Sequence, residues 1–159
     1  MHQYCKLLKD LEKDKIIIKK EISNASHFKL NFNNPETIKL CELLLLAERR
    51  NLKVHAKLYA DEVVKFKDAE MIIIFGSVLR SKEFNDVDVL FLTNQTKKVN
   101  NFCLEISKVR TKPVVPLIMK QEDLIRAMKQ KKEATLGMMK EGIVLKGESI
   151  FMEVIKNVN

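Results

Sequence analysis

The 159-residue chain has no tryptophan, and aromatic residues make up only 6% of it. A surface that binds single-stranded nucleic acid by stacking needs aromatic side chains, so the composition argues against this mode of binding. The three cysteines, Cys5, Cys41 and Cys103, are odd in number and far apart. They also lack the close spacing of zinc ligands, so we expect neither a disulfide framework nor a zinc site.

Long apolar segments are missing as well. No apolar run approaches the roughly 20 residues that a membrane-spanning helix needs, and the N-terminus has no secretory apolar region. We therefore expect a cytoplasmic protein with no membrane partner. The composition is otherwise that of a globular protein, with 46% hydrophobic and 31% charged residues. The length fits one domain, or one domain with a small appendage.

Positive charge dominates, with 29 Lys and Arg residues against 21 Asp and Glu residues and a formal net charge of +8. A partner that carries phosphates, whether a nucleotide or a nucleic acid, would suit this excess. A lysine-rich solvated surface without any such partner explains it equally well. The charge alone therefore does not identify the partner.

Residues 72–91 are the most informative segment of the chain. An apolar run ends in Gly76-Ser77, a short polar loop follows, and Asp86-Val87-Asp88 opens a second apolar run. If these residues form a strand, alternation places both aspartates on one face, about 7 Å apart. Two carboxylates so close repel each other unless a cation lies between them. Mg²⁺ takes oxygen ligands of this kind and often shares them with substrate phosphates.

The Gly76-Ser77 turn fits the same chemistry. Glycine lets the backbone approach a phosphate closely, and serine adds a hydroxyl donor. Taken separately, a Gly-Ser turn and an Asp-x-Asp strand edge are common structural features. Their order between two apolar runs favours a site for a metal and a nucleotide.

This arrangement resembles the signature of the nucleotidyltransferase superfamily typified by DNA polymerase β, and most closely that of the minimal nucleotidyltransferases of prokaryotes. The likeness covers roughly residues 69–150. It implies an α+β fold in which helices flank a small mixed sheet of the polymerase β type. It also implies that Asp86 and Asp88 are catalytic residues that bind Mg²⁺, and that Gly76, Ser77 and Arg80 bind the nucleotide phosphates.

The resembled family also uses a third carboxylate on the next strand, which completes the metal site. Alignment of that strand places Val115, or less closely Pro116, at this position, and neither side chain binds a metal. Glu122 and Asp123 follow the strand and are the alternative candidates for this ligand, but acids are also expected there at a helix N-terminus. The sequence therefore leaves open whether the chain is an enzyme.

The resemblance implies a protein that binds a nucleoside triphosphate, with ATP the expected one, together with Mg²⁺. Relatives of this size include antitoxins that transfer AMP to a partner toxin, often a ribonuclease of the HEPN type, so a protein acceptor is expected. The missing third acid favours an alternative function. In it, the chain is a catalytically inactive nucleotide-binding or DNA-associated transcriptional regulator.

The N-terminal residues predict a helix over 3–13, a strand over 15–22, a turn at 24–26 and a second strand near 28–30. This order resembles the second half of a winged helix-turn-helix, the recognition helix and its wing. The helices that would precede it in that family are absent, so we expect at most weak binding to DNA. A role in dimerisation or packing is the alternative.

Asn34-Pro35-Glu36 is a favourable helix start, with Asn as the cap and Pro at the first helical position. The helix that follows is apolar around much of its girth, which predicts a contribution to a homodimer interface. The pattern breaks near Asn51 and resumes as a second helix, on which His55 is expected to be solvated.

We expect three segments: a winged-helix-like remnant (1–34), a helical connector that includes the dimerisation helix (35–68), and a minimal nucleotidyltransferase domain (69–159). In the third segment we expect strands at 71–75, 86–93, 113–119 and 143–145, and helices at 77–81, 97–110, 122–131, 133–141 and 148–156. The inward-facing residues of the helix over 97–110 are expected to be Val99, Phe102, Cys103, Ile106 and Val109. Because Pro116 has no N–H group, its strand is expected to lie at an edge of the sheet or to contain a bulge.

Overall fold

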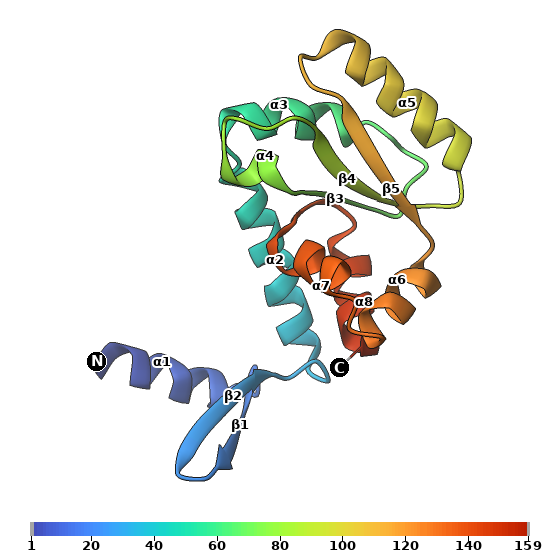
Figure 1. The fold of residues 1–159 in the computed structure, drawn as a ribbon. Coiled ribbons are helices and arrows are strands. Elements are labelled where there is room, and N and C mark those ends of the chain that lie inside the picture. Colours follow the sequence, from blue (N-terminus) through green and yellow to red (C-terminus); the bar gives the residue numbers. More distant parts are fainter. Residues whose placement is uncertain (1, 159) are drawn as a thin grey trace. The chain divides into compact units, whose positions relative to one another are not determined.

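The computed structural model of the chain describes residues 2–158, and for residues 2, 3 and 5 the backbone alone. The chain divides into two compact units, residues 1–43 and residues 44–159. Both units are drawn in Figure 1. The fold is α+β, as the sequence predicted. The units meet inside the long helix, at 43/44, whereas the sequence suggested boundaries at 34/35 and 68/69.

The first unit consists of a helix, a hairpin and the beginning of a long helix that continues into the second unit. These elements are α1 (His2–Lys13), β1 (Ile17–Ile22), β2 (Ala25–Leu30) and α2 (Pro35–Arg50). The two strands are antiparallel. Ser23 and Asn24 between them both have positive φ, as a two-residue hairpin turn requires. The predicted order of helix, strand, turn and strand is confirmed, with the turn one residue earlier than expected.

Asn34 caps α2 as predicted, because its Oδ1 accepts a hydrogen bond of 2.9 Å from the Glu36 amide. Its Nδ2 also donates to the carbonyl oxygen of Lys15 at 3.1 Å. Thr37 is fully buried and donates its hydroxyl to the carbonyl oxygen of Ile16 at 3.2 Å. Polar bonds to the backbone therefore tie the start of α2 to the α1–β1 connection.

The second unit contains a four-stranded mixed sheet in the order β5-β4-β3-β6. Its strands are β3 (Met71–Phe75), β4 (Val87–Leu92), β5 (Val114–Met119) and β6 (Ile143–Lys146). β3 is antiparallel to both β4 and β6, whereas β4 and β5 are parallel. Pro116 thus lies on an edge strand, as its missing N–H predicted.

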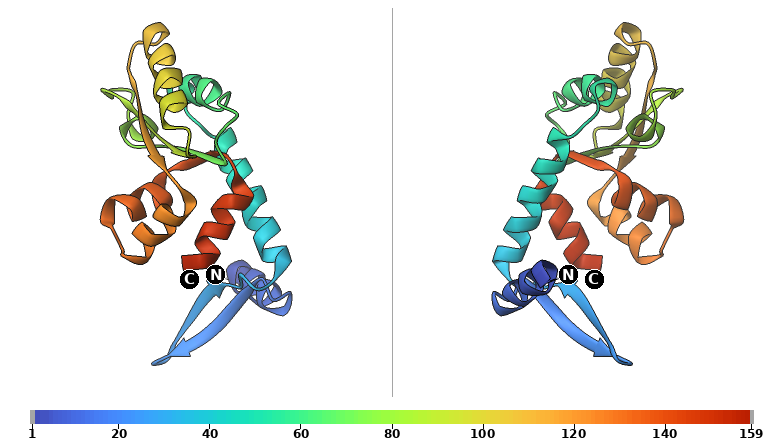
Figure 2. Two further views of the ribbon diagram at one scale, coloured as in Figure 1. Left: turned by 90° about the vertical axis from the view of Figure 1, so that its right-hand side faces the viewer. Right: turned by 90° about the vertical axis from the view of Figure 1, so that its left-hand side faces the viewer.

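Helices cover both faces of this sheet (Figure 2). They are α3 (Val54–Val63), α4 (Ser77–Arg80), α5 (Thr96–Val109), α6 (Gln121–Lys129), α7 (Glu133–Glu141) and α8 (Glu148–Val158). Side chains of α3 and α5 pack on one face, and those of α6, α7 and α8 pack on the other. Every helix expected from the sequence of this unit is present.

Alternation along β4 decides which core each residue joins. Val87, Val89 and Phe91 are buried on the face that α3 and α5 cover. Leu90 and Leu92 are buried on the opposite face. Asp88 shares the phase of Leu90 and Leu92, so its carboxylate lies at the beginning of β4 on the α6–α8 side.

Val109 was expected to face the core, and this prediction is wrong, because its side chain is 77% exposed. The buried positions of α5 are Val99, Cys103 and Ile106. The next residue in that helical phase is Arg110, whose Nη2 binds Glu62 Oε1 at 2.7 Å. Val109 therefore falls on the solvent side. Among the described helices, none is both long enough and apolar enough to cross a membrane.

Candidate functional site

Gly76 brings the two halves of the sequence motif, the Gly76-Ser77 turn and the Asp86-Val87-Asp88 segment, into contact. Its φ of 85° and ψ of −157° lie in a region that only glycine adopts readily. A Cβ atom placed on Gly76 would overlap the Oδ2 atom of Asp88. The preceding residue, Phe75, is the register partner of Asp88 across β3 and β4. The bend after β3 therefore lies directly against the Asp88 carboxylate.

Ser77 begins the short helix α4, immediately after this bend. Val78 is fully buried and anchors the helix in the core, while the Ser81 amide donates to the carbonyl oxygen of Ser77 at 2.9 Å. Ser77 itself is partly exposed. Its hydroxyl is thus held beside Gly76 by a rigid turn, at a position that solvent can reach.

Asp86 lies one residue before β4, and Asp88 is the second residue of the strand. Burial raises the pKa of Asp88 above its ordinary value of 3.8, and the negative charge of Asp86 raises it further. The two carboxylates are therefore close enough to repel each other. Within the described part of the chain, neither of them forms an ion pair. A cation would remove this unfavourable interaction.

The register of β5 identifies which of its residues is the neighbour of Asp88, where the resembled family has a third acid. Val115 is paired with Asp88, and Pro116 is paired with Val89. Register partners point to the same side of a sheet, so Val115 lies beside Asp88 and Pro116 belongs to the opposite face. Val115 is 43% exposed. Of the two alternatives that the sequence left open, Val115 is the neighbour of the carboxylate pair.

Glu122 and Asp123 lie too far away to complete the site. They belong to the first turn of α6, beyond the end of the sheet where Leu92 pairs with Met119. Leu92 is four residues along β4 from Asp88, a distance of about 13 Å at the usual rise per residue. Asp123 binds Arg126 at 2.8 Å. The interpretation of these acids as helix N-terminal residues is confirmed.

Two protein carboxylates fit one common mode of Mg²⁺ binding. The ion often takes one or two carboxylates from the protein and completes its octahedron with water and substrate phosphates. Among the described residues, no group of three or more His, Cys, Asp or Glu side chains could hold a metal alone. Asp86 and Asp88 beside the Gly76 bend therefore suit an ion whose other ligands come from a nucleotide and water, rather than an ion that the protein alone coordinates.

Arg80, the last residue of α4, is engaged with α7. Its Nη1 lies 3.0 Å from Glu141 Oε2, and the two side chains are 66% and 61% exposed. Ion pairs this exposed contribute little to stability. The guanidinium can therefore exchange the Glu141 carboxylate for a phosphate at small cost.

His55 was expected to be solvated, and this prediction is wrong. Its Nε2 lies 2.9 Å from the carbonyl oxygen of Val78, so this nitrogen carries the proton and donates. The ring stacks on Phe84 with centroids 5.7 Å apart. Tyr59, one turn further along α3, meets the same Phe84 edge-on at 5.9 Å. These contacts hold the loop that leads into Asp86.

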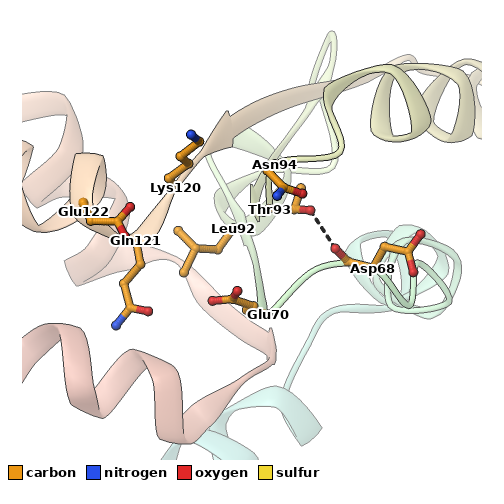
Figure 3. Close-up of a pocket in the computed structure, with 8 residues that line it drawn as sticks. All are labelled: Asp68, Glu70, Leu92, Thr93, Asn94, Lys120, Gln121 and Glu122. Atoms are coloured by element: carbon orange, nitrogen blue, oxygen red, sulfur yellow. Dashed lines mark hydrogen bonds between the residues drawn. The ribbon is translucent and has the colours of Figure 1, made fainter.

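A polar cavity of about 340 Å³ lies at the other end of the sheet (Figure 3). It is formed where β4 and β5 end and β3 begins, and is lined by Asp68, Glu70, Leu92, Thr93, Asn94, Lys120, Gln121 and Glu122. Asp68 is already bonded, since its carboxylate binds Lys98 at 2.9 Å and its carbonyl oxygen accepts from Thr93 Oγ1 at 2.6 Å. None of the motif residues lines this cavity.

Comparisons with protein-family models, with curated proteins and with solved structures give no match to this chain. The assignment of a function therefore depends on the geometry of the motif residues. The structure brings Gly76 and Asp88 into contact and leaves Ser77 and Asp86 beside them. Arg80 is near in sequence, but its side chain is paired with Glu141.

Proposed function

We propose that this chain is a nucleotidyltransferase-like protein that binds a nucleoside triphosphate together with Mg²⁺. Asp86 and Asp88 would hold the ion, and Gly76 and Ser77 would contact the phosphates. ATP is the expected nucleotide, and AMP is the group that would be transferred. The resemblance of the motif to that of minimal nucleotidyltransferases supports a protein acceptor, such as a partner toxin of the HEPN type.

The observation that carries this proposal is the contact between the Gly76 bend and the Asp88 carboxylate. The bend has a conformation suited to glycine, and a Cβ atom on Gly76 would overlap the Asp88 carboxylate in its present position. A turn with a purely structural role would not need a carboxylate at this position. The unpaired charges of Asp86 and Asp88 provide the second part of the argument, since a bound cation would stabilise both of them.

The residues of this chain would act mainly by positioning. The Gly76 backbone lets a phosphate approach, the Ser77 hydroxyl donates a hydrogen bond to it, and Arg80 adds positive charge after release from Glu141. When bound, Mg²⁺ would neutralise charge on the phosphate oxygens during transfer. Phe84 and His55 keep the loop before Asp86 in place.

The position of Val115 favours a second candidate function, in which the nucleotide binds but is not transferred. A third carboxylate beside Asp88 would add a metal ligand and a base for the acceptor hydroxyl, and valine supplies neither. Loss of a general base typically lowers a rate by two to four orders of magnitude. The chain would then be a nucleotide-binding regulator, with contact to DNA through the β1–β2 hairpin as a weaker extension.

Transfer and binding can be measured separately to decide between these candidates. The chain is incubated with Mg²⁺, a HEPN-type toxin and ATP labelled at the α-phosphate, and ATP binding is followed by fluorescence anisotropy of a labelled analogue. We expect label on the toxin with the wild type and none with Asp88→Asn. Asp68→Asn is the matched control, because it removes an acid at the far end of the sheet. Binding without labelling would favour the regulator, and absence of binding would contradict both.

A further inference from the structure

A cavity of about 520 Å³ lies at the end of the sheet where β3 ends and β6 begins. This volume lies in the range of about 300–1,000 Å³ that is typical of small-molecule sites. Its apolar lining consists of Leu52, Ala56, Leu79 and Ile143, which are buried or partly buried. The residues that line the cavity all belong to the second compact unit. An apolar lining of this kind suits a flat ring system.

Hydrogen bonds to the backbone fix the walls of this cavity. Lys53 Nζ donates to the carbonyl oxygen of Arg80 at 2.9 Å, which joins the α2–α3 connection to α4. Arg49 Nη1 donates to the carbonyl oxygen of Leu145 at 2.6 Å, which joins the end of α2 to β6. Sites for small ligands are usually formed before the ligand binds, and these bonds give the cavity that property.

The cavity continues from the candidate phosphate site. Ile143, in its lining, is paired with Ile74, two residues before Gly76. Arg80 also lines the cavity and follows Ser77 by three residues on α4. Side chains three residues apart on a helix lie on the same side of it, with Cβ atoms about 5–6 Å apart. A ligand whose phosphates contact Ser77 can therefore extend past Arg80 and place its other end in the cavity.

Two polar side chains of the cavity have unused hydrogen-bonding groups. Glu48 and Asn51 line it at the end of α2, where the Asn51 amide donates to the carbonyl oxygen of Glu48 at 3.0 Å. Both residues are exposed, and in the described part of the chain neither side chain forms a hydrogen bond or an ion pair. The Glu48 carboxylate only accepts hydrogen bonds, whereas the Asn51 carboxamide both donates and accepts. Together they suit a ligand that carries an amino group beside an acceptor nitrogen.

Adenine presents this combination, since its amino group lies beside ring nitrogens that accept hydrogen bonds. Hypoxanthine and guanine carry a carbonyl oxygen in place of that amino group. A carboxylate and a carbonyl oxygen have no proton to share, so they repel each other. The charge of Glu48 therefore favours adenine over these two bases.

We propose that this cavity holds the adenine of the nucleotide whose phosphates bind at Gly76 and Ser77, and that Glu48 selects the base by accepting a hydrogen bond from its amino group. The proposal rests on the proposed nucleotide-binding function and assigns the part of the ligand that the motif residues do not contact. Arg80 pairs with Glu141, and both line the cavity. When Arg80 turns to the phosphates, the Glu141 carboxylate becomes an acceptor for the ribose hydroxyls.

Calorimetric titration of the full chain with ATP and with inosine triphosphate, both with Mg²⁺, tests the choice of base. Inosine triphosphate carries hypoxanthine, so the two probes differ only at the edge of the base that faces Glu48. We expect the wild type to bind ATP about tenfold more tightly than inosine triphosphate. Glu48→Gln should remove most of this preference, because the new amide can donate to the carbonyl oxygen. Glu153→Gln is the matched control and should keep the preference, since Glu153 is an exposed acid on α8 that does not line the cavity. Far-UV circular dichroism verifies that both variants fold.

Inorganic tripolyphosphate with Mg²⁺ separates this proposal from the function on which it rests, because it has the phosphates of ATP and no base. We expect it to bind to the wild type and to Glu48→Gln with the same affinity, and not to Asp88→Asn. Equal affinities of the wild type for ATP and inosine triphosphate, or an unchanged preference in Glu48→Gln, would overturn the assignment of the base but leave the metal and phosphate site in place. If neither ATP nor tripolyphosphate binds, the proposed function fails and this proposal fails with it.

Discussion

The substitution Gly76→Ala tests the central contact of the site. Alanine must adopt a φ of 85° and a ψ of −157°, a conformation that costs of order 1–3 kcal/mol for a residue with a Cβ atom. The new methyl group also meets Asp88 Oδ2. Because this oxygen is the end of a side chain, the carboxylate can rotate away, and it then leaves the position from which we propose that it binds Mg²⁺.

Urea denaturation measures the cost of the backbone strain at residue 76, and nucleotide binding measures the effect of displacing the Asp88 carboxylate. We expect Gly76→Ala to lower the free energy of unfolding by about 1–3 kcal/mol and to weaken the binding of Mg²⁺ and ATP. In an Asp88→Ala background the same substitution should cost less, because the overlapping carboxylate is gone. A double-mutant cycle therefore isolates the contact from the backbone strain.

Gly137→Ala is the control, because the same chemical change should have the opposite sign. Gly137 lies inside α7, and a Cβ atom there meets nothing within 4 Å. Alanine in a helix interior stabilises by about 0.5–1 kcal/mol relative to glycine. If Gly76→Ala were as stable as the wild type, or if its cost were the same with and without Asp88, the proposed contact between the bend and the carboxylate would be refuted.

Three further outcomes follow from the same geometry. Folding raises the pKa of Asp88 above 3.8, so the folded chain binds this proton more tightly than the unfolded chain does. The free energy of unfolding therefore falls as the pH rises from 3.8 through the pKa of the folded state. Asp88→Asn should therefore be more stable than the wild type at pH 7 without Mg²⁺, and urea titrations should show this advantage vanish below about pH 4; an advantage that is independent of pH would contradict the burial argument. Phe84→Ala should lower the free energy of unfolding by about 1–2 kcal/mol, less than for a fully buried Phe, because it removes the contacts with His55 and Tyr59; an unchanged thermal midpoint would show that the loop is held by other groups. Val115→Asp should place a carboxylate about 5 Å from Asp88, so Mg²⁺ should raise the thermal midpoint of the variant more than that of the wild type. An equal rise would mean that a side chain at position 115 does not reach the ion.

The order of helices and strands could be predicted from the sequence because its signals are local. Asn34-Pro35 marks the start of α2, and the apolar run before Gly76 marks β3. The motif was found for the same reason, since Gly76, Asp86 and Asp88 lie within thirteen residues of one another in the chain. The edge position of β5 also followed from one local fact, the missing N–H of Pro116.

Features that depend on distant segments could not be predicted. His55 lies on α3 among lysines, and only the folded chain places it against Val78 and Phe84. The prediction for the last turn of α5 is wrong because Val109 is apolar and so looks like a core residue. Arg110, not Val109, is the next residue along the buried face of the helix. The cavity in Figure 3 combines three separate segments, 68–70, 92–94 and 120–122.

Calorimetric titration with ATP, in the presence and absence of Mg²⁺, measures most directly whether the carboxylate pair and the Gly76 bend form a nucleotide site. We expect saturable binding to the wild type that requires Mg²⁺ and is lost in Asp88→Asn, while Asp68→Asn binds as the wild type does. Equal heats for the wild type and Asp88→Asn, or binding of the same strength without the metal, would contradict it.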